Sequence, residues 1–136
     1  MRKVSVLIGI CMLVALALTL VAQGPTDLSP IMKDVAATST SLRMNLMNNA
    51  AEDVAKDAAK LQQDFTQAQG FFKAMKAQDA VDAAKVNVDA AGEVVKAVKV
   101  NNLEAAKAPA GTIQKSCKAC HDVHREQLPD KTYKFK

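Results

Sequence analysis

The sequence predicts an all-α fold, an antiparallel four-helix bundle formed by the residues after position 23. Alanine and lysine are abundant in this part of the chain and glycine is rare, which favours helices over strands. Apolar residues recur at helical steps of three, four and seven along four stretches, and no stretch alternates with period two. Because the links between the stretches are short, consecutive helices are expected to run antiparallel.

The first 23 residues are predicted to be a secretory signal that is not part of the bundle. Arg2 and Lys3 give a positive start, and residues 4–22 carry no charge and no proline, which is the layout of a signal peptide. An uncleaved membrane anchor is the alternative, because an apolar run of this length can span a bilayer. The domain at 24–136 is therefore expected to be periplasmic, with membrane contact only through an uncleaved anchor.

The first two helices are predicted from their start signals and apolar stripes. Ser29 is expected as an N-cap with Pro30 at the first helical position, and this helix should end near Asn48. Asn49 and Glu52 are spaced as in a capping box, so the second helix should follow directly. The stripes comprise Leu28, Ile31, Met32, Val35, Leu42 and Leu46 in the first helix, and Val54, Ala58, Leu61, Phe65, Ala68, Phe71, Phe72 and Met75 in the second.

The third and fourth helices follow after short links. Asp79 can start the third helix. Asn101 or Asn102 opens the fourth, and Pro129 should close it. Two residues inside the fourth helix should kink or split it, Pro109 and Gly111. The stripes comprise Val81, Ala84, Val88, Ala91, Val95 and Val98 in the third helix, and Leu103, Ala106, Ala110, Ile113, Cys117, Cys120 and His124 in the fourth.

The predicted core is poor in large side chains. Its stripes are rich in alanine, and the chain has one tyrosine and no tryptophan. A bundle with so little leucine and phenylalanine would be marginally stable on its own core. A large, flat, apolar cofactor would supply the missing buried surface.

The fourth helix carries the segment Cys117-Lys-Ala-Cys120-His121, which is the pattern of covalent haem attachment. Two thiols that add to the two vinyl groups of a haem have to lie about one helical turn apart on one side of the helix. The histidine that follows then reaches the iron as an axial ligand. A thioredoxin-like redox pair would need a βαβ setting, and the sequence shows no strand pattern. A zinc site would need about four ligands, and the chain offers too few beyond the motif and His124. The segment therefore predicts one covalently attached haem c, with Cys117, Cys120 and His121 binding the haem and its iron.

The place of this motif near the end of the fourth helix resembles cytochrome c prime, the class II cytochromes c, and the related four-helix haem b cytochromes. At residue level the resemblance rests on Cys117-Lys-Ala-Cys120-His121-Asp-Val-His124-Arg125. It implies a mono-haem protein with the haem near one end of the bundle. The family commonly has an aromatic residue where His124 stands and an arginine where Arg125 stands, so His124 is a departure.

Met32 is predicted to be the second axial ligand. In an antiparallel bundle, the first turn of the first helix lies at the end where the fourth helix finishes, and methionine is a common haem ligand. A methionine at this place also resembles the axial ligand of the four-helix haem b cytochromes. Simple core packing of Met32 is the alternative. Met44 and Met47 lie about 18–22 Å further along the helix and are expected in the core, and Met75 lies near a helix end.

Three further side chains are predicted to contact the haem. Phe71 and Phe72 are expected at the same bundle end, where one of them should pack on the porphyrin, and ordinary core packing is the alternative. Arg125 is one turn after His121 and can pair with a haem propionate, and the alternative is a solvated surface cation. His124 is expected to be a partly exposed side chain or a hydrogen-bonding neighbour rather than an iron ligand.

The predicted function is single-electron transfer between exported redox partner proteins. The alternative is a five-coordinate haem protein that binds small gases such as nitric oxide or carbon monoxide. No base, nucleophile or second metal set accompanies the motif, so no enzyme is predicted. Removal of Arg2 and Lys3 lowers the formal net charge from +4 to +2, which is too mild to indicate nucleic-acid binding. The resemblance also allows a homodimer formed through the first helix.

Overall fold

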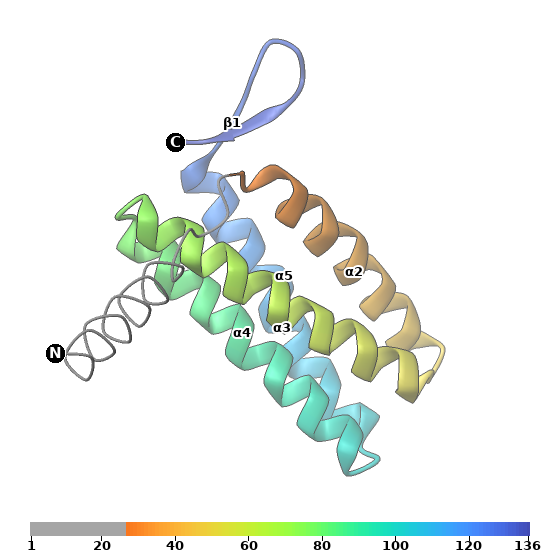
Figure 1. Ribbon diagram of the computed structural model, residues 1–136. Coiled ribbons are helices and arrows are strands. Elements are labelled where there is room, and N and C mark those ends of the chain that lie inside the picture. Colours follow the sequence, from red (N-terminus) through yellow and green to blue (C-terminus); the bar gives the residue numbers. More distant parts are fainter. Residues whose placement is uncertain (1–26) are drawn as a thin grey trace, which may run out of the picture.

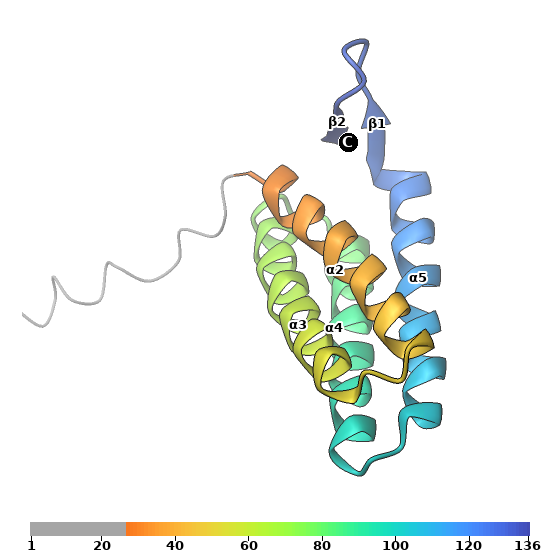
Figure 2. The ribbon, with the colours of Figure 1, turned by 90° about the vertical axis from the view of Figure 1, so that its right-hand side faces the viewer.

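Four packed helices make up most of the described chain, which is residues 27–136 of a computed structural model. The helices are α2 (Ser29–Met47), α3 (Ala51–Ala74), α4 (Gln78–Lys99) and α5 (Leu103–His124). Each runs back along the one before it, so the domain is an antiparallel four-helix bundle, as the sequence predicts (Figures 1 and 2). The expected signal at 1–23 lies outside the described residues. Within residues 27–136 no helix has the length and apolarity needed to cross a membrane.

The three links between the helices share one backbone design. Each link has a middle residue in the left-handed region, with φ between 54° and 59°: Asn49, Lys76 and Asn101. The next amide donates to the carbonyl five residues earlier, as Ala50 does to Asn45 at 2.9 Å. This closure satisfies the last carbonyls of each helix and turns the chain within three residues.

The structure corrects two of the predicted helix caps and confirms a third. Asn49 ends α2 instead of capping α3, because asparagine tolerates the left-handed conformation that a C-terminal cap needs. Ser29 is already helical, and its amide donates to Asp27 Oδ1 at 2.8 Å, so Ser29 is not the N-cap. Asn102 is the N-cap of α5, and its side chain accepts a hydrogen bond from the Ala105 amide at 3.0 Å.

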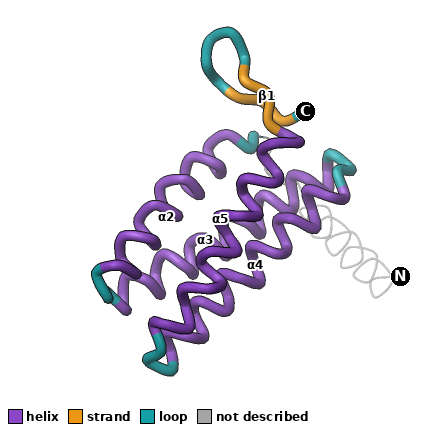
Figure 3. Tube along the Cα trace, turned by 180° about the vertical axis from the view of Figure 1, so that it is seen from behind, coloured by secondary structure: helices purple, strands orange, loops and turns teal. Residues whose placement is uncertain are grey.

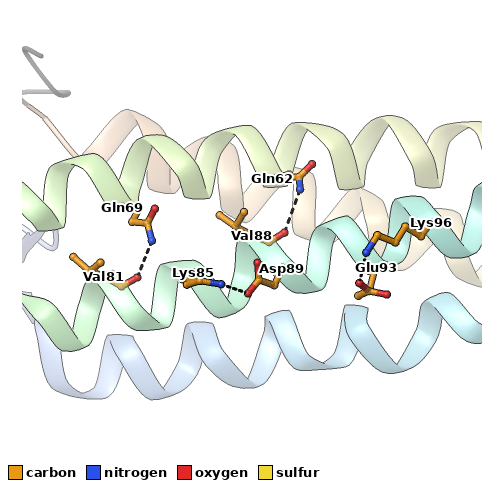
Figure 4. A network of polar contacts seen from close by, with 8 residues as sticks. All are labelled: Gln62, Gln69, Val81, Lys85, Val88, Asp89, Glu93 and Lys96. Atoms are coloured by element: carbon orange, nitrogen blue, oxygen red, sulfur yellow. Dashed lines mark hydrogen bonds and ion pairs between the residues drawn. The ribbon is translucent and has the colours of Figure 1, made fainter. Parts of the chain in front are cut away.

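Helices α3 and α4 form the most closely packed pair. A Cβ at Gly92 would lie 3.0 Å from Gln62 Nε2, a close contact that a small shift of the Gln62 side chain would relieve. Gln62 donates to the Val88 carbonyl at 3.5 Å, and Gln69 donates to the Val81 carbonyl at 3.4 Å (Figure 4). Of the nineteen buried hydrophobic residues, eight are alanines, which confirms the alanine-rich core expected from the stripes.

Helix α5 is continuous, so the predicted split at Pro109 and Gly111 does not occur. Pro109 lacks the amide that would bond the Ala105 carbonyl, but Ala105 is exposed, and water can reach its carbonyl. Ala106 and Ile113 are buried on either side of the proline and hold the helix against the core.

A β-hairpin follows α5, which ends at His124 rather than near Pro129. Strands β1 (Arg125–Gln127) and β2 (Tyr133–Phe135) pair antiparallel, and the hairpin extends from one end of the bundle (Figures 1 and 3). The sequence patterns missed it, because strands of three residues are too short to show a period-two alternation.

Candidate functional site

Helix α5 presents the predicted attachment residues in its last two turns. Cys117, Cys120 and His121 are all half-buried, and both cysteines are free thiols. Cys117 packs against the core, and the adjacent Ser116 hydroxyl donates to the Ala83 carbonyl of α4 at 3.4 Å. Residues three apart on a helix are surface neighbours, so the two thiols lie one turn apart on one side of α5.

The environment of the two thiols keeps them protonated at neutral pH. Burial raises the pKa of the Cys117 thiol to about 11, and the neighbouring Cys120 adds to the rise. Burial also raises the pKa of Cys120, and the carboxylate of Asp79 adds to it. Redox-active and catalytic cysteines have the opposite property, a lowered pKa in an electropositive setting. The local electrostatics therefore speak against a reactive thiol pair.

The imidazole of His121 is held in its neutral form. Burial lowers its pKa, the positive charge of Arg125 lowers it further, and the negative charge of Asp122 opposes these two effects. A neutral imidazole has a free lone pair, which a metal ligand requires.

The structure brings the predicted haem contacts to one end of the bundle. Met32 lies in the first turn of α2, half-buried against the core, and α2 begins at the end where α5 finishes (Figure 2). Phe72 is buried near the end of α3, and Phe71 is half-buried beside it with its ring centroid 5.9 Å away. The aromatic side chains and Met32 are thus placed around the end of α5.

The other methionines are not in the core. The side chains of Met44 and Met47 are 53% and 73% exposed, so the prediction that both are buried is wrong. Leu42 and Leu46 form the buried stripe of α2. Met44 follows Leu42 by two residues and Met47 follows Leu46 by one, so helical geometry turns both methionines away from the core. Met75, just after α3, is also exposed.

Arg125 is the first residue of β1, and its side chain is engaged on the hairpin. Its guanidinium carbon lies 4.2 Å from the centroid of the Tyr133 ring, a cation–π contact. Arg125 is exposed, and its pairing with a haem propionate stays a prediction.

His124 is a hydrogen-bonding neighbour, one of the two roles expected for it. Its Nε2 lies 2.8 Å from Asp79 Oδ2 at the start of α4, and its Nδ1 lies 3.2 Å from the main-chain oxygen of Lys136. Its ring stacks on Phe135, with centroids 4.9 Å apart and planes 14° apart. Phe135 also contacts Phe72, with centroids 5.2 Å apart. Neither Asp79 nor Phe135 was predicted to be near the site, because the sequence shows no fixed spacing between them and His124.

The fold is that of a four-helix all-α domain, and its Cys117-Lys-Ala-Cys120-His121 segment lies near one end of the bundle. No family model matches the sequence, and comparisons with curated proteins and with solved structures find no match. Among residues 27–136, no three histidine, cysteine or acidic side chains are grouped so that they could hold a metal ion.

Proposed function

We propose that this domain is an exported mono-haem c-type cytochrome of the class II type, which carries single electrons between redox partner proteins. The observation that carries the proposal is the Cys117-Lys-Ala-Cys120-His121 motif on the last turns of α5, with two free, half-buried thiols. The raised pKa values of the two thiols speak against thiol redox chemistry, and the lowered pKa of His121 suits a metal-binding imidazole.

The packing between the helices supports room for a cofactor. Helix α2 packs mainly on α3, α5 packs mainly on α4, and of the neighbouring helix pairs α2 and α5 contact one another least. The cleft of about 340 Å³ between these two helices, with Leu46, Met47 and Lys107 among its lining residues, lies at the opposite end of the bundle from His121. The two helices that carry Met32 and His121 are therefore the pair that can separate at the lowest cost in lost contacts.

Each residue has a defined task in this proposal. Cys117 and Cys120 would hold the haem on α5, and His121 and Met32 would supply ligands to its iron. When bound, the haem supplies an iron centre that gains or loses one electron. Phe71 and Phe72 provide apolar surface at the same end, which excludes water and keeps reorganisation on electron transfer small.

The proposal is tested by expression of the full chain in a bacterium that attaches haem to exported proteins. Wild type should keep its haem through acid–acetone extraction, and its spectrum should be six-coordinate and low-spin. Cys117→Ala or Cys120→Ala should leave haem extractable or held by one bond. Lys118→Ala, which changes an exposed residue between the two thiols, is the matched control and should behave as wild type.

Two outcomes would contradict parts of this proposal. Release of all haem from the wild type would show that the attachment assignment is wrong. A wild-type spectrum that is high-spin and five-coordinate, with carbon monoxide binding, would replace electron transfer by gas binding.

A further inference from the structure

The last turn of α5 is tied to two other parts of the chain by one side chain, His124. Its Nε2 is 2.8 Å from Asp79 Oδ2, which joins α5 to the start of α4. Its Nδ1 is 3.2 Å from the main-chain oxygen of Lys136, and the Lys136 amide donates back to the His124 carbonyl at 2.9 Å. Both ring partners are acceptors, so the ring donates to both when it carries two protons and to one otherwise.

Aromatic contacts continue this connection into the core. The His124 ring stacks on Phe135 of β2, and Phe135 lies against Phe72 at 5.2 Å and against Phe71 at 6.0 Å between ring centroids. Phe135 is half-buried, whereas Tyr133 on the same strand is exposed. A two-stranded hairpin of this size is at best marginally stable by itself. The hairpin therefore depends on this cluster for its position.

We propose that His124, Asp79 and Phe135 form a clasp that fixes the last turn of α5, and that His124 is a positioning residue for the iron ligand His121. Helix ends fray unless they are held, and His121 lies one turn before the end of α5. The clasp fastens this turn on two sides, to α4 and to the hairpin.

This inference rests on the proposed function for its effect at the iron, and not for its effect on the hairpin. The test uses the full-length holoprotein and four variants. His124→Phe keeps the ring stacking and loses both bonds, and Phe135→Ala removes the stacking. The matched controls are Tyr133→Ala, an exposed change two residues earlier on the same strand, and Val123→Ala, an exposed change in the same turn of α5. If Phe135→Ala fails to fold, Phe135→Leu takes its place.

Two measurements separate the clasp from a general loss of stability. Hydrogen exchange at the Lys136 amide should be at least ten-fold faster in His124→Phe and Phe135→Ala than in the controls. Less exogenous imidazole should be needed to displace the native iron ligands in the same two variants, with a shifted reduction potential. Normal exchange in both variants would overturn the clasp. Faster exchange with unchanged imidazole titration and potential would overturn the positioning role of His124.

Failure of the proposed function can be told apart from failure of the His124 clasp. If the wild type carries no covalent haem, electron transfer and the positioning role are both wrong. Exchange at the Lys136 amide still decides in that protein whether His124 and Phe135 hold the hairpin.

Discussion

In the proposed haem protein, Met32 is the residue on which the choice between electron transfer and gas binding depends most. A thioether on the iron favours the ferrous state, so Met32→Ala should lower the reduction potential and open the iron to carbon monoxide. Met44→Ala and Met47→Ala are matched controls on the same helix. Their exposed side chains should leave the spectrum unchanged and alter the free energy of unfolding by no more than about 0.5 kcal/mol. If Met32→Ala kept the native spectrum and Met75→Ala changed it, the ligand would lie after α3.

The thiols give a second prediction at this scale, for the haem-free chain. A raised pKa leaves less thiolate at any given pH, and the thiolate is the form that reacts. Alkylation of Cys117 by iodoacetamide should therefore be slow at pH 7 and should rise steeply only toward its pKa of about 11. Unfolding in urea should speed the reaction at pH 7 by removing the burial that raises the pKa. Equal rates in folded and unfolded chains at pH 7 would contradict this account.

Single residues also show how far the sequence could predict the site. The spacing within the motif predicts the geometry of Cys117, Cys120 and His121, because one helical turn fixes all three. The partners of His124 come from α4 and from the chain end, 45 and 12 residues away, and no local pattern reports such pairs.

At the scale of secondary-structure elements, the cap of α5 can be tested directly. Asn102 satisfies a free amide in the first turn, so Asn102→Ala should lower the free energy of unfolding by about 1 kcal/mol. Asn101→Gly is the matched control, because glycine suits the left-handed backbone there and should be neutral or slightly stabilising. The measurement is the urea midpoint of each variant. A larger loss in Asn101→Gly than in Asn102→Ala would contradict the assignment of the cap.

Helices were more predictable than their ends. The apolar stripes predict all four helices, since burial of one face of a helix demands this periodicity. Capping signals in the sequence were ambiguous because one residue type can serve at either end of a helix. An asparagine such as Asn49 can cap the start of one helix or end the helix before it. Pro109 shows that packing on both sides of a proline overrides its local preference. The hairpin depends on the aromatic cluster around Phe135, which is a tertiary contact and leaves no periodic trace in the sequence.

The whole molecule is held by a core with little large apolar volume. The largest fully buried side chains are Leu61, Ile113, Val54 and Val94, and alanines supply much of the remaining interior. Small side chains permit close helix packing but remove little apolar surface from water. The core is thus sufficient to specify the bundle and leaves α2 only loosely packed on α5.

A covalently attached haem would complete this core, and the haem-free protein should therefore be much less stable. The apolar surface of the haem would be buried between α2 and α5, the neighbouring helices with the fewest mutual contacts. Loss of the haem would therefore remove buried area where these helices bury least against one another. The double variant Cys117→Ala, Cys120→Ala, purified free of haem, should melt roughly 10 °C or more below the holoprotein, corresponding to a few kcal/mol for a domain of this size. Leu61→Ala in the holoprotein is the reference for comparison, since truncation of a buried leucine of this kind lowers the free energy of unfolding by about 2–5 kcal/mol. Thermal unfolding followed by circular dichroism gives both values. Equal melting temperatures for the haem-free variant and the holoprotein would show that the alanine-rich bundle is complete without a cofactor, and would remove the energetic argument for haem in this fold.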